Sequence, residues 1–221
     1  MTTMPALLIT VTLTALLMSV ASAQTSATTE PDAQLRALLA TPGDPARGKS
    51  AFATCEGCHR KTASGRSDGT IPRLTGQHAS VIVKQVLDIR AGRRNNPSMQ
   101  PFVVDPAFTM THLVDLAAYL QTLPFDGSIG KGPGTDLARG KELYERDCAA
   151  CHGARGEGDA ARFHPMVAAQ HYRYLLREMI AIRDGSRGNS NAEMVQVVKP
   201  YRQAEMEAVS DYMSQMAPPK P

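Results

Sequence analysis

The 221-residue chain is short of the side chains that usually fill a hydrophobic core. It has no tryptophan, five phenylalanines and six tyrosines, and no segment alternates between apolar and polar residues as a half-buried strand does. Small domains bury a modest part of their surface and are marginally stable on their own. The sequence therefore gives no indication of a sheet, and its composition leaves room for a bulky cofactor to complete the core.

Cysteine is also scarce, and all four cysteines lie in two short motifs, CEGCH at 55–59 and CAACH at 148–152. Two cysteines separated by two residues and followed directly by histidine form the attachment signature of c-type haem. The thiols bond two porphyrin vinyl groups, and the histidine binds the iron. The predicted attachment residues are Cys55, Cys58 and His59 in the first motif and Cys148, Cys151 and His152 in the second.

Three other uses of paired cysteines fit the sequence less well. A four-cysteine zinc site places its two pairs about 15 to 20 residues apart, whereas these pairs begin 93 residues apart. A thioredoxin-like pair is expected near a βαβ pattern, and a disulfide inside each motif leaves both histidines unexplained. We therefore expect two covalently bound haem c groups.

The beginning of the chain predicts export. Residues 5–20 form an apolar run that is too short to span a bilayer well, and Ala21, Ser22 and Ala23 supply a small-residue cleavage site. We predict a signal peptide at 1–23, a mature chain from Gln24 and a periplasmic location, because haem is attached to this motif outside the bacterial inner membrane. The run lacks the usual preceding positive charge, so a retained anchor stays an alternative.

The two halves of the chain are copies of each other. Adding 93 to a residue number maps the first motif onto the second, and the match continues without a gap to Arg94 and Arg187. The matching pairs beyond the motifs include Gly65 and Gly158, Pro72 and Pro165, Gln77 and Gln170, His78 and His171, Arg90 and Arg183, and Gly92 and Gly185. We expect an extension at 24–41, domains at 42–124 and 135–217, a Gly- and Pro-rich linker at 125–134 and a tail at 218–221.

Both copies show helical periodicity. The expected helices lie at 46–54, 78–91 and 111–122 in the first copy and at 138–147, 171–184 and 203–216 in the second. The sequence thus predicts an all-α protein.

An iron that only transfers electrons needs a second axial ligand, and methionine in that position favours a high reduction potential. Of eleven methionines, Met99 and Met194 recur in matching loops before the final helices, 40 and 42 residues after the haem histidines. Met110 and Met206 do not correspond when those helices are aligned, so we expect them to fill the cores. We therefore predict Met99 and Met194 as sixth ligands of the irons.

Two further recurring pairs have open roles. For His78 and His171 the alternatives are a contact at the start of a helix, a contact with a haem propionate and a solvated surface position. For Arg90 and Arg183 they are a propionate contact and a solvated surface position.

In its motifs the chain resembles the dihaem cytochrome c4 family. The resemblance rests on the two CxxCH motifs, the repeated Pro-x-x-x-x-Gln-His spacing, the endings IRAGRR and IRDGSR, the methionines and the DLAAYL helix. It implies two tandem class I cytochrome c domains, each wrapped around one covalent haem and packed through a pseudo-twofold axis, with the propionates facing each other. It also implies that the carbonyls of Pro72 and Pro165 accept a hydrogen bond from the haem histidines.

These features predict an electron-transfer protein and not an enzyme, because two fully ligated irons leave no position for a substrate. We expect a periplasmic carrier between a quinol-oxidising complex and a terminal oxidase or another reductase. We do not expect nucleic acid as a partner. We expect the protein to associate with the membrane only peripherally, through its partner proteins. The alternatives are a dihaem subunit of a dehydrogenase, such as a sulfide-oxidising flavocytochrome, and, with one open iron, a dihaem peroxidase or a thiosulfate dehydrogenase.

The two copies differ in charge. Residues 40–124 hold ten Lys or Arg and six Asp or Glu, a net charge of +4, whereas residues 135–217 hold eleven and twelve, a net charge of −1. Arg60 and Lys61 directly follow the first motif, where Gly153 and Ala154 follow the second. Because such asymmetry steers charged partners, we expect acidic partners to dock near the first haem.

Overall fold

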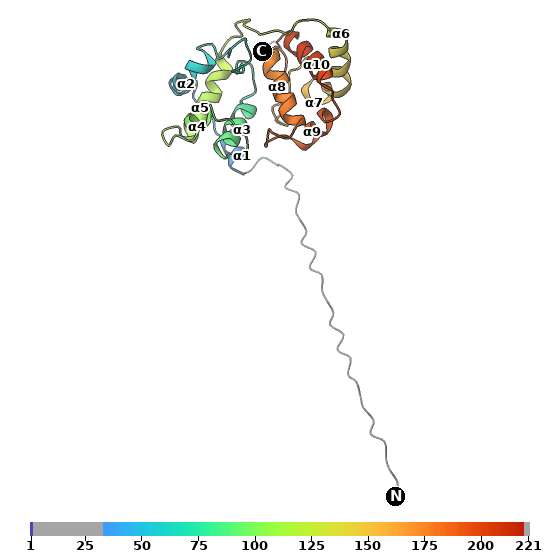
Figure 1. Cartoon of the computed structure of the whole chain (residues 1–221). Coiled ribbons are helices and arrows are strands. Elements are labelled where there is room, and N and C mark those ends of the chain that lie inside the picture. Colours follow the sequence, from blue (N-terminus) through green and yellow to red (C-terminus); the bar gives the residue numbers. More distant parts are fainter. Residues whose placement is uncertain (2–32, 219–221) are drawn as a thin grey trace. The chain divides into compact units, whose positions relative to one another are not determined.

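The structure, a computed structural model, describes Met1 and residues 33–218 (Figure 1). The predicted signal peptide and the first part of the 24–41 extension lie outside the described residues. Within them the chain forms helices and loops, with no strand apart from one isolated bridge between Asp159 and His164. No helix in this part of the chain is long and apolar enough to cross a bilayer. The all-α prediction is confirmed.

The helices follow the duplication. The first copy contains α1 (Ala33–Ala40), α2 (Pro45–His59), α3 (Ala79–Arg90), α4 (Gln100–Val103) and α5 (Met110–Thr122). The second contains α6 (Leu137–Asp147), α7 (Ala149–His152), α8 (Tyr172–Arg183), α9 (Ala192–Val198) and α10 (Gln203–Gln215). All six expected helices are present, and the short helices α4 and α9 were not expected.

The two CxxCH motifs differ in their helical setting. Asp44 caps the start of α2 by accepting hydrogen bonds from the backbone of Ala46 and Arg47, and Pro45 occupies the first turn. From there α2 runs without interruption through His59. In the second copy the helix breaks at Cys148 into α6 and α7.

The helix that leads into each CxxCH motif crosses the last helix of its copy at a glycine. A Cβ on Gly48 of α2 would lie 1.9 Å from the carbonyl oxygen of Asp115 in α5, and one on Gly140 of α6 would lie 2.2 Å from that of Ala208 in α10. No side chain fits in either place. This close approach explains why a glycine occupies the corresponding place in both copies.

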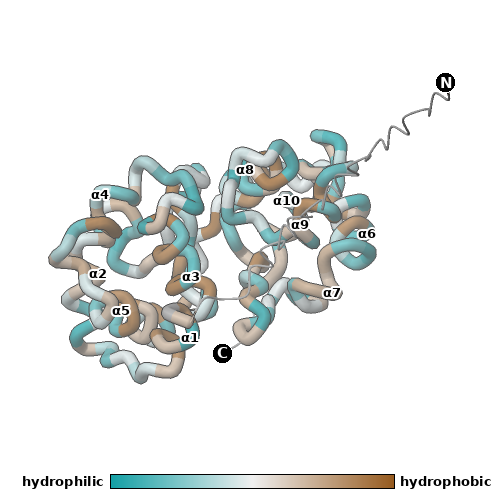
Figure 2. The backbone as a smooth tube through the Cα atoms, turned by 90° about the horizontal axis from the view of Figure 1, so that it is seen from below, coloured by the Kyte–Doolittle hydropathy of each residue, from teal (hydrophilic) through white to brown (hydrophobic). Residues whose placement is uncertain are grey.

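Each copy has its own hydrophobic core, to which α3 and α5 contribute hydrophobic segments in the first copy (Figure 2). The fully buried rings of Phe52 and Tyr144 pack on Tyr119 and Tyr212, with centroids 5.7 Å apart in both pairs. Leu35 of α1 is 4% exposed and belongs to the first core. The described end of the 24–41 extension therefore covers the first core, a role that the sequence did not reveal.

Side-chain amides join the two copies in a symmetric exchange. Gln77 accepts a hydrogen bond from the Met166 amide and donates one to the Met166 carbonyl, both at 3.0 Å. Gln170 makes the same pair of bonds with the backbone of Arg73, both at 2.9 Å. Because Met166 is the equivalent of Arg73 in the repeat, the contact has the pseudo-twofold symmetry that the family resemblance implied.

The recurring histidines belong to the same interface. His78 Nε2 donates to the Glu157 carbonyl at 2.8 Å, and His171 Nε2 donates to the Ser64 carbonyl at 2.8 Å. Glu157 is the repeat equivalent of Ser64, so these bonds are symmetric too. Neither histidine has the solvated role that the sequence left open: His171 is fully buried and His78 is half-buried.

A second symmetric cluster lies between α3 and α8. The Arg94 guanidinium contacts Gln85 and Glu178, each at 2.9 Å, and the Arg187 guanidinium contacts the same residues at 3.2 and 3.0 Å. Gln85 and Glu178 are themselves repeat equivalents. Removing one member of such a shielded ion cluster leaves the others uncompensated, which makes the cluster a strong constraint on the packing of the copies.

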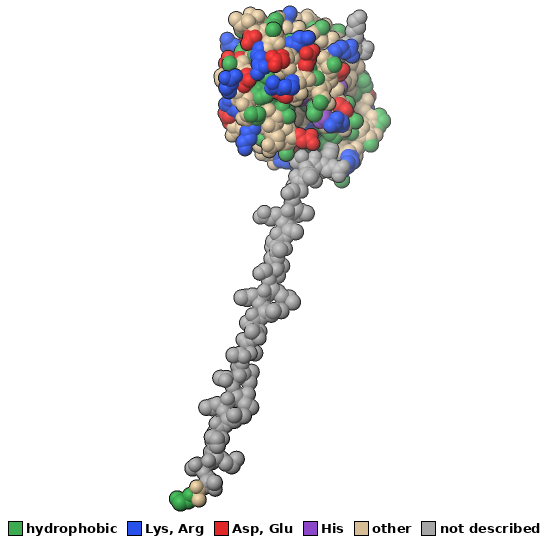
Figure 3. Space-filling view, turned by 90° about the vertical axis from the view of Figure 1, so that its right-hand side faces the viewer, with side chains coloured by type: hydrophobic (Ala, Val, Ile, Leu, Met, Phe, Trp, Pro, Cys, Tyr) green, Lys and Arg blue, Asp and Glu red, His purple; other side chains and the backbone are tan. Residues whose placement is uncertain are grey.

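Basic and acidic side chains are interspersed on the face of the molecule that Figure 3 shows, so neither sign of charge dominates there.

The buried imidazole of His171 is held in one tautomer. Its Nδ1 accepts a hydrogen bond from the Gly130 amide at 2.9 Å, and a backbone amide can only donate, so the proton must sit on Nε2. Burial, the largest cause, lowers the pKa of His171 below its ordinary value of 6.5, and the bond to Ser64 acts in the opposite direction. The neutral imidazole is thus the form that the folded protein stabilises.

We expect this histidine to make the interface sensitive to acid. Because its pKa is lower in the folded state, its contribution to stability is complete above about pH 6.5 and is lost as the pH falls through the folded pKa. Between about pH 7.5 and pH 5.5 the free energy of unfolding of the wild type should therefore fall more than that of His171→Gln, measured by denaturant titration. Parallel curves for the two proteins would contradict this assignment.

Candidate haem sites

The haem histidines are oriented by proline carbonyls, and His59 is buried whereas His152 is half-buried. His59 is 5% exposed, and its Nδ1 donates to the Pro72 carbonyl at 3.1 Å. His152 Nδ1 donates to the Pro165 carbonyl at 2.9 Å. Each bond fixes the ring and places the proton on Nδ1, so Nε2 keeps the lone pair that a metal requires.

Burial also sets the protonation of these sites. It lowers the pKa of His59 and of His152, which favours the neutral imidazole that ligates iron. It raises the pKa of the Cys55 thiol to about 11 and that of Cys148 to about 12. Burial therefore disfavours the thiolate form of these two cysteines.

The four cysteines form no disulfide, so their sulfur atoms are available for bonds to haem. In the part of the chain that the structure describes, no three His, Cys, Asp or Glu side chains gather as a metal-binding group. The two motifs lie in separate copies, each with its own core.

The predicted methionine ligands lie against the same cores as the attachment cysteines. Met99, at the start of α4, is half-buried and packs with Cys55 against the first core. Met194 lies within α9, not in a loop, and packs with Cys148 at the second core. The ligand roles of these methionines stay predictions.

The other two methionines considered as ligands are differently placed. Met206 is fully buried in the second core. The sulfur of Met110 lies 3.7 Å from the guanidinium of Arg90. Both positions suit the packing role expected for them.

The recurring arginines brace the methionine segments. Arg90, at the end of α3, donates to the carbonyl oxygens of Val103 and Phe108, in the segment that follows Met99. Arg183, at the end of α8, lies 3.5 Å from the Tyr201 carbonyl, beyond Met194. Through these hydrogen bonds the two arginines connect the ends of α3 and α8 to the backbone that follows each predicted methionine ligand.

The residues of each copy fit a covalently bound haem. Cys55 and Cys58, or Cys148 and Cys151, would hold the porphyrin, and the adjacent histidine supplies a neutral Nε2 for the iron. When bound there, haem c supplies a reversible one-electron couple of the iron. The fold and the two sites thus define a dihaem c-type cytochrome.

Comparison with known proteins agrees with this class. The family model for cytochrome c matches residues 137–217. A thiosulfate dehydrogenase electron acceptor of Stutzerimonas stutzeri is 35% identical over 171 residues, which cover 72% of this chain and 77% of that protein. Cytochrome c4 of Thiocapsa roseopersicina is 34% identical over 187 residues, covering 77% of this chain and 92% of the relative.

A solved structure adds the fold. Reduced recombinant cytochrome c4 from Pseudomonas stutzeri superposes with a TM-score of 0.71 at 24% identity, covering 79% of this chain and all of the other. The chain belongs to the dihaem cytochrome c4 family, as its motifs predicted.

The ligand assignment can be tested one haem at a time. Met99→Leu or Met194→Leu should remove the weak sulfur-to-iron absorption band of one haem and lower its reduction potential, because the thioether stabilises ferrous iron. Met110→Leu is the control and should leave both bands in place. If Met110→Leu removed a band that Met99→Leu spared, the ligand assignment in the first copy would be wrong.

Proposed function

We propose that the protein is a periplasmic electron carrier that moves electrons one at a time between a respiratory donor complex and a terminal oxidase or another reductase. The observation that carries this proposal is that, in each copy, the predicted methionine ligand packs against the same core as an attachment cysteine, while the haem histidine keeps Nε2 available for the iron. A His/Met pair occupies both axial positions of an iron, and a saturated iron transfers electrons without binding a substrate. The predicted signal peptide supports the periplasmic location.

A second candidate is the dedicated acceptor or subunit of a dehydrogenase. Its support is the 35% identical relative named as a thiosulfate dehydrogenase electron acceptor. In this case the same one-electron chemistry serves a particular donor enzyme. The two candidates differ in the donor, not in the chemistry at the irons.

A redox titration combined with carbon monoxide binding tests the carrier proposal. We expect two one-electron waves, low-spin spectra in both oxidation states and no carbon monoxide complex, because neither iron has a free position. The Met99→Leu variant is the positive control, since its first iron should bind carbon monoxide. Carbon monoxide binding by the wild type would show an open iron position, and either this result or turnover of peroxide would contradict the carrier proposal.

The donor is distinguished by kinetics. Reduction by thiosulfate together with a thiosulfate dehydrogenase would favour the dedicated acceptor if it were much faster than reduction by a quinol-oxidising complex. The opposite order of rates would favour the respiratory carrier.

A further inference from the structure

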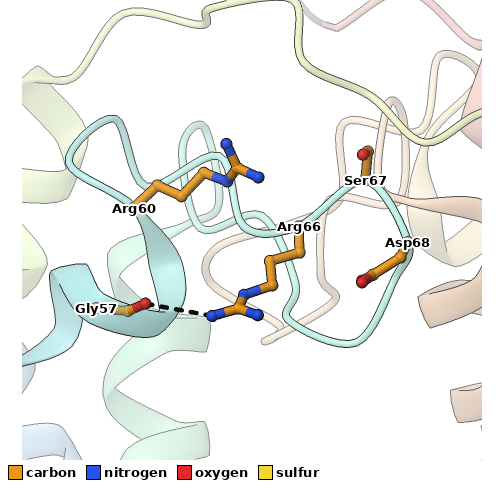
Figure 4. Close-up of a pocket in the computed structure, with 5 residues that line it drawn as sticks. All are labelled: Gly57, Arg60, Arg66, Ser67 and Asp68. Carbon is orange, nitrogen blue, oxygen red and sulfur yellow. Dashed lines mark hydrogen bonds between the residues drawn. The ribbon is translucent and has the colours of Figure 1, made fainter.

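A surface pocket of about 340 Å³ lies beside the first CxxCH motif (Figure 4). Its lining residues are Gly57, Arg60, Arg66, Ser67 and Asp68. Gly57 lies between the two cysteines and next to Cys58, whose exposed thiol is the attachment point for one porphyrin edge. A group bound in this pocket would therefore be close to the edge of the first haem.

The two guanidinium groups of the pocket are free to bind an anion. Both arginines are exposed, and Arg66 makes one long hydrogen bond, 3.5 Å, to the Gly57 carbonyl. Among the described residues, no hydrogen-bond or ion-pair partner engages the Arg60 guanidinium. One oxygen of the Asp68 carboxylate already accepts two hydrogen bonds from Thr70, at 2.8 and 2.6 Å. The pocket thus presents two guanidinium groups that can donate hydrogen bonds to an anion, and one carboxylate that already accepts hydrogen bonds from Thr70.

Arg60 occupies a backbone conformation that belongs to glycine. Its φ and ψ are 66° and 160°, in a region that residues with a side chain rarely adopt. In the second copy the equivalent residue is Gly153, with φ 80° and ψ 156°. The turn itself therefore favours glycine, and the arginine side chain does not serve local folding.

The second copy has different residues at the positions that line this pocket in the first copy. The repeat equivalents of Arg60, Arg66 and Ser67 are Gly153, Asp159 and Ala160. The duplication therefore provides an internal comparison: the same turn follows both motifs, but only the first copy has arginine at these two positions. The first copy is thus more positive than the second beside its CxxCH motif, as it is in net charge over the whole copy.

We propose that the Arg60–Arg66 pocket receives a carboxylate side chain of an acidic redox partner and docks that partner at the edge of the first haem. The proposal rests on the proposed electron-transfer function and names the docking surface for it. Guanidinium groups recognise carboxylates through paired, charge-assisted hydrogen bonds. All the lining residues are exposed, so a small free anion would be held weakly by mobile side chains in water. A carboxylate fixed on a protein surface arrives with further contacts and is steered by the positive first copy.

Two variants separate docking from folding. Arg60→Gly introduces the residue of the second copy and relieves the backbone, so thermal stability should not fall. Arg66→Ala removes the other guanidinium. The matched control is Arg155→Ala, because Arg155 is 71% exposed at its side chain and lies three residues after His152 of the second motif.

The measurement is stopped-flow reduction of the oxidised dihaem protein by reduced flavodoxin, a small acidic electron donor, over a range of ionic strength. At low ionic strength Arg60→Gly and Arg66→Ala should each lower the second-order rate constant by about threefold to tenfold, and the deficit should shrink as salt rises. Arg155→Ala should match the wild type. Reduction by uncharged durohydroquinone should be equal in all four proteins.

Three results would count against specific claims. Rates for Arg60→Gly and Arg66→Ala equal to those of Arg155→Ala would overturn the docking site and leave the electron-transfer function standing. If millimolar sulfate at fixed ionic strength bound in the pocket but left the difference between Arg60→Gly and the wild type unchanged, the pocket would hold a free anion only and the docking proposal would be wrong. A wild type that accepted electrons from neither donor would instead contradict the proposed function.

Discussion

The hydrogen bond from each haem histidine to a proline carbonyl links the haem site to the interface between the copies. The Pro72 carbonyl accepts a hydrogen bond from His59. The backbone of the next residue, Arg73, makes two hydrogen bonds with the side-chain amide of Gln170. The segment after each CxxCH motif therefore contacts both the haem histidine of its own copy and a glutamine of the other copy. A displacement of either haem histidine would therefore displace residues at the interface. Such coupling suits a protein that holds two redox centres at a fixed distance from each other.

The duplication has not left the two sites electrostatically equal. Arg73 is 3% exposed and donates to the carbonyls of Thr75, Ala168 and Ala169, whereas its repeat equivalent is the apolar Met166. Burial lowers the pKa of Arg73 to about 10, so the side chain is still cationic at neutral pH. This buried positive charge has no counterpart in the second copy, so the segments that follow the two haem histidines differ in their electrostatic environment.

The features predicted from sequence were those with a local signal. The CxxCH motifs, the periodic helices and the family could be identified because each is defined by residues close together in the chain. The recurrence of Gln77, His78 and their equivalents was visible as well, but their partners lie in the other copy, so no local pattern could show that they build the interface. The bracing role of Arg90 was hidden for a similar reason, since its acceptors are backbone carbonyls beyond the candidate ligand. The strain at Arg60 appears only in the backbone angles, although the glycine at the equivalent position 153 was a hint.

The central claim is that each copy of the repeat holds its own covalent haem, and mass spectrometry of a proteolytic digest of the purified protein tests it most directly. One haem should be found on the peptide that contains Cys55 and Cys58, and another on the peptide that contains Cys148 and Cys151. An unmodified CxxCH peptide from either copy would contradict the account.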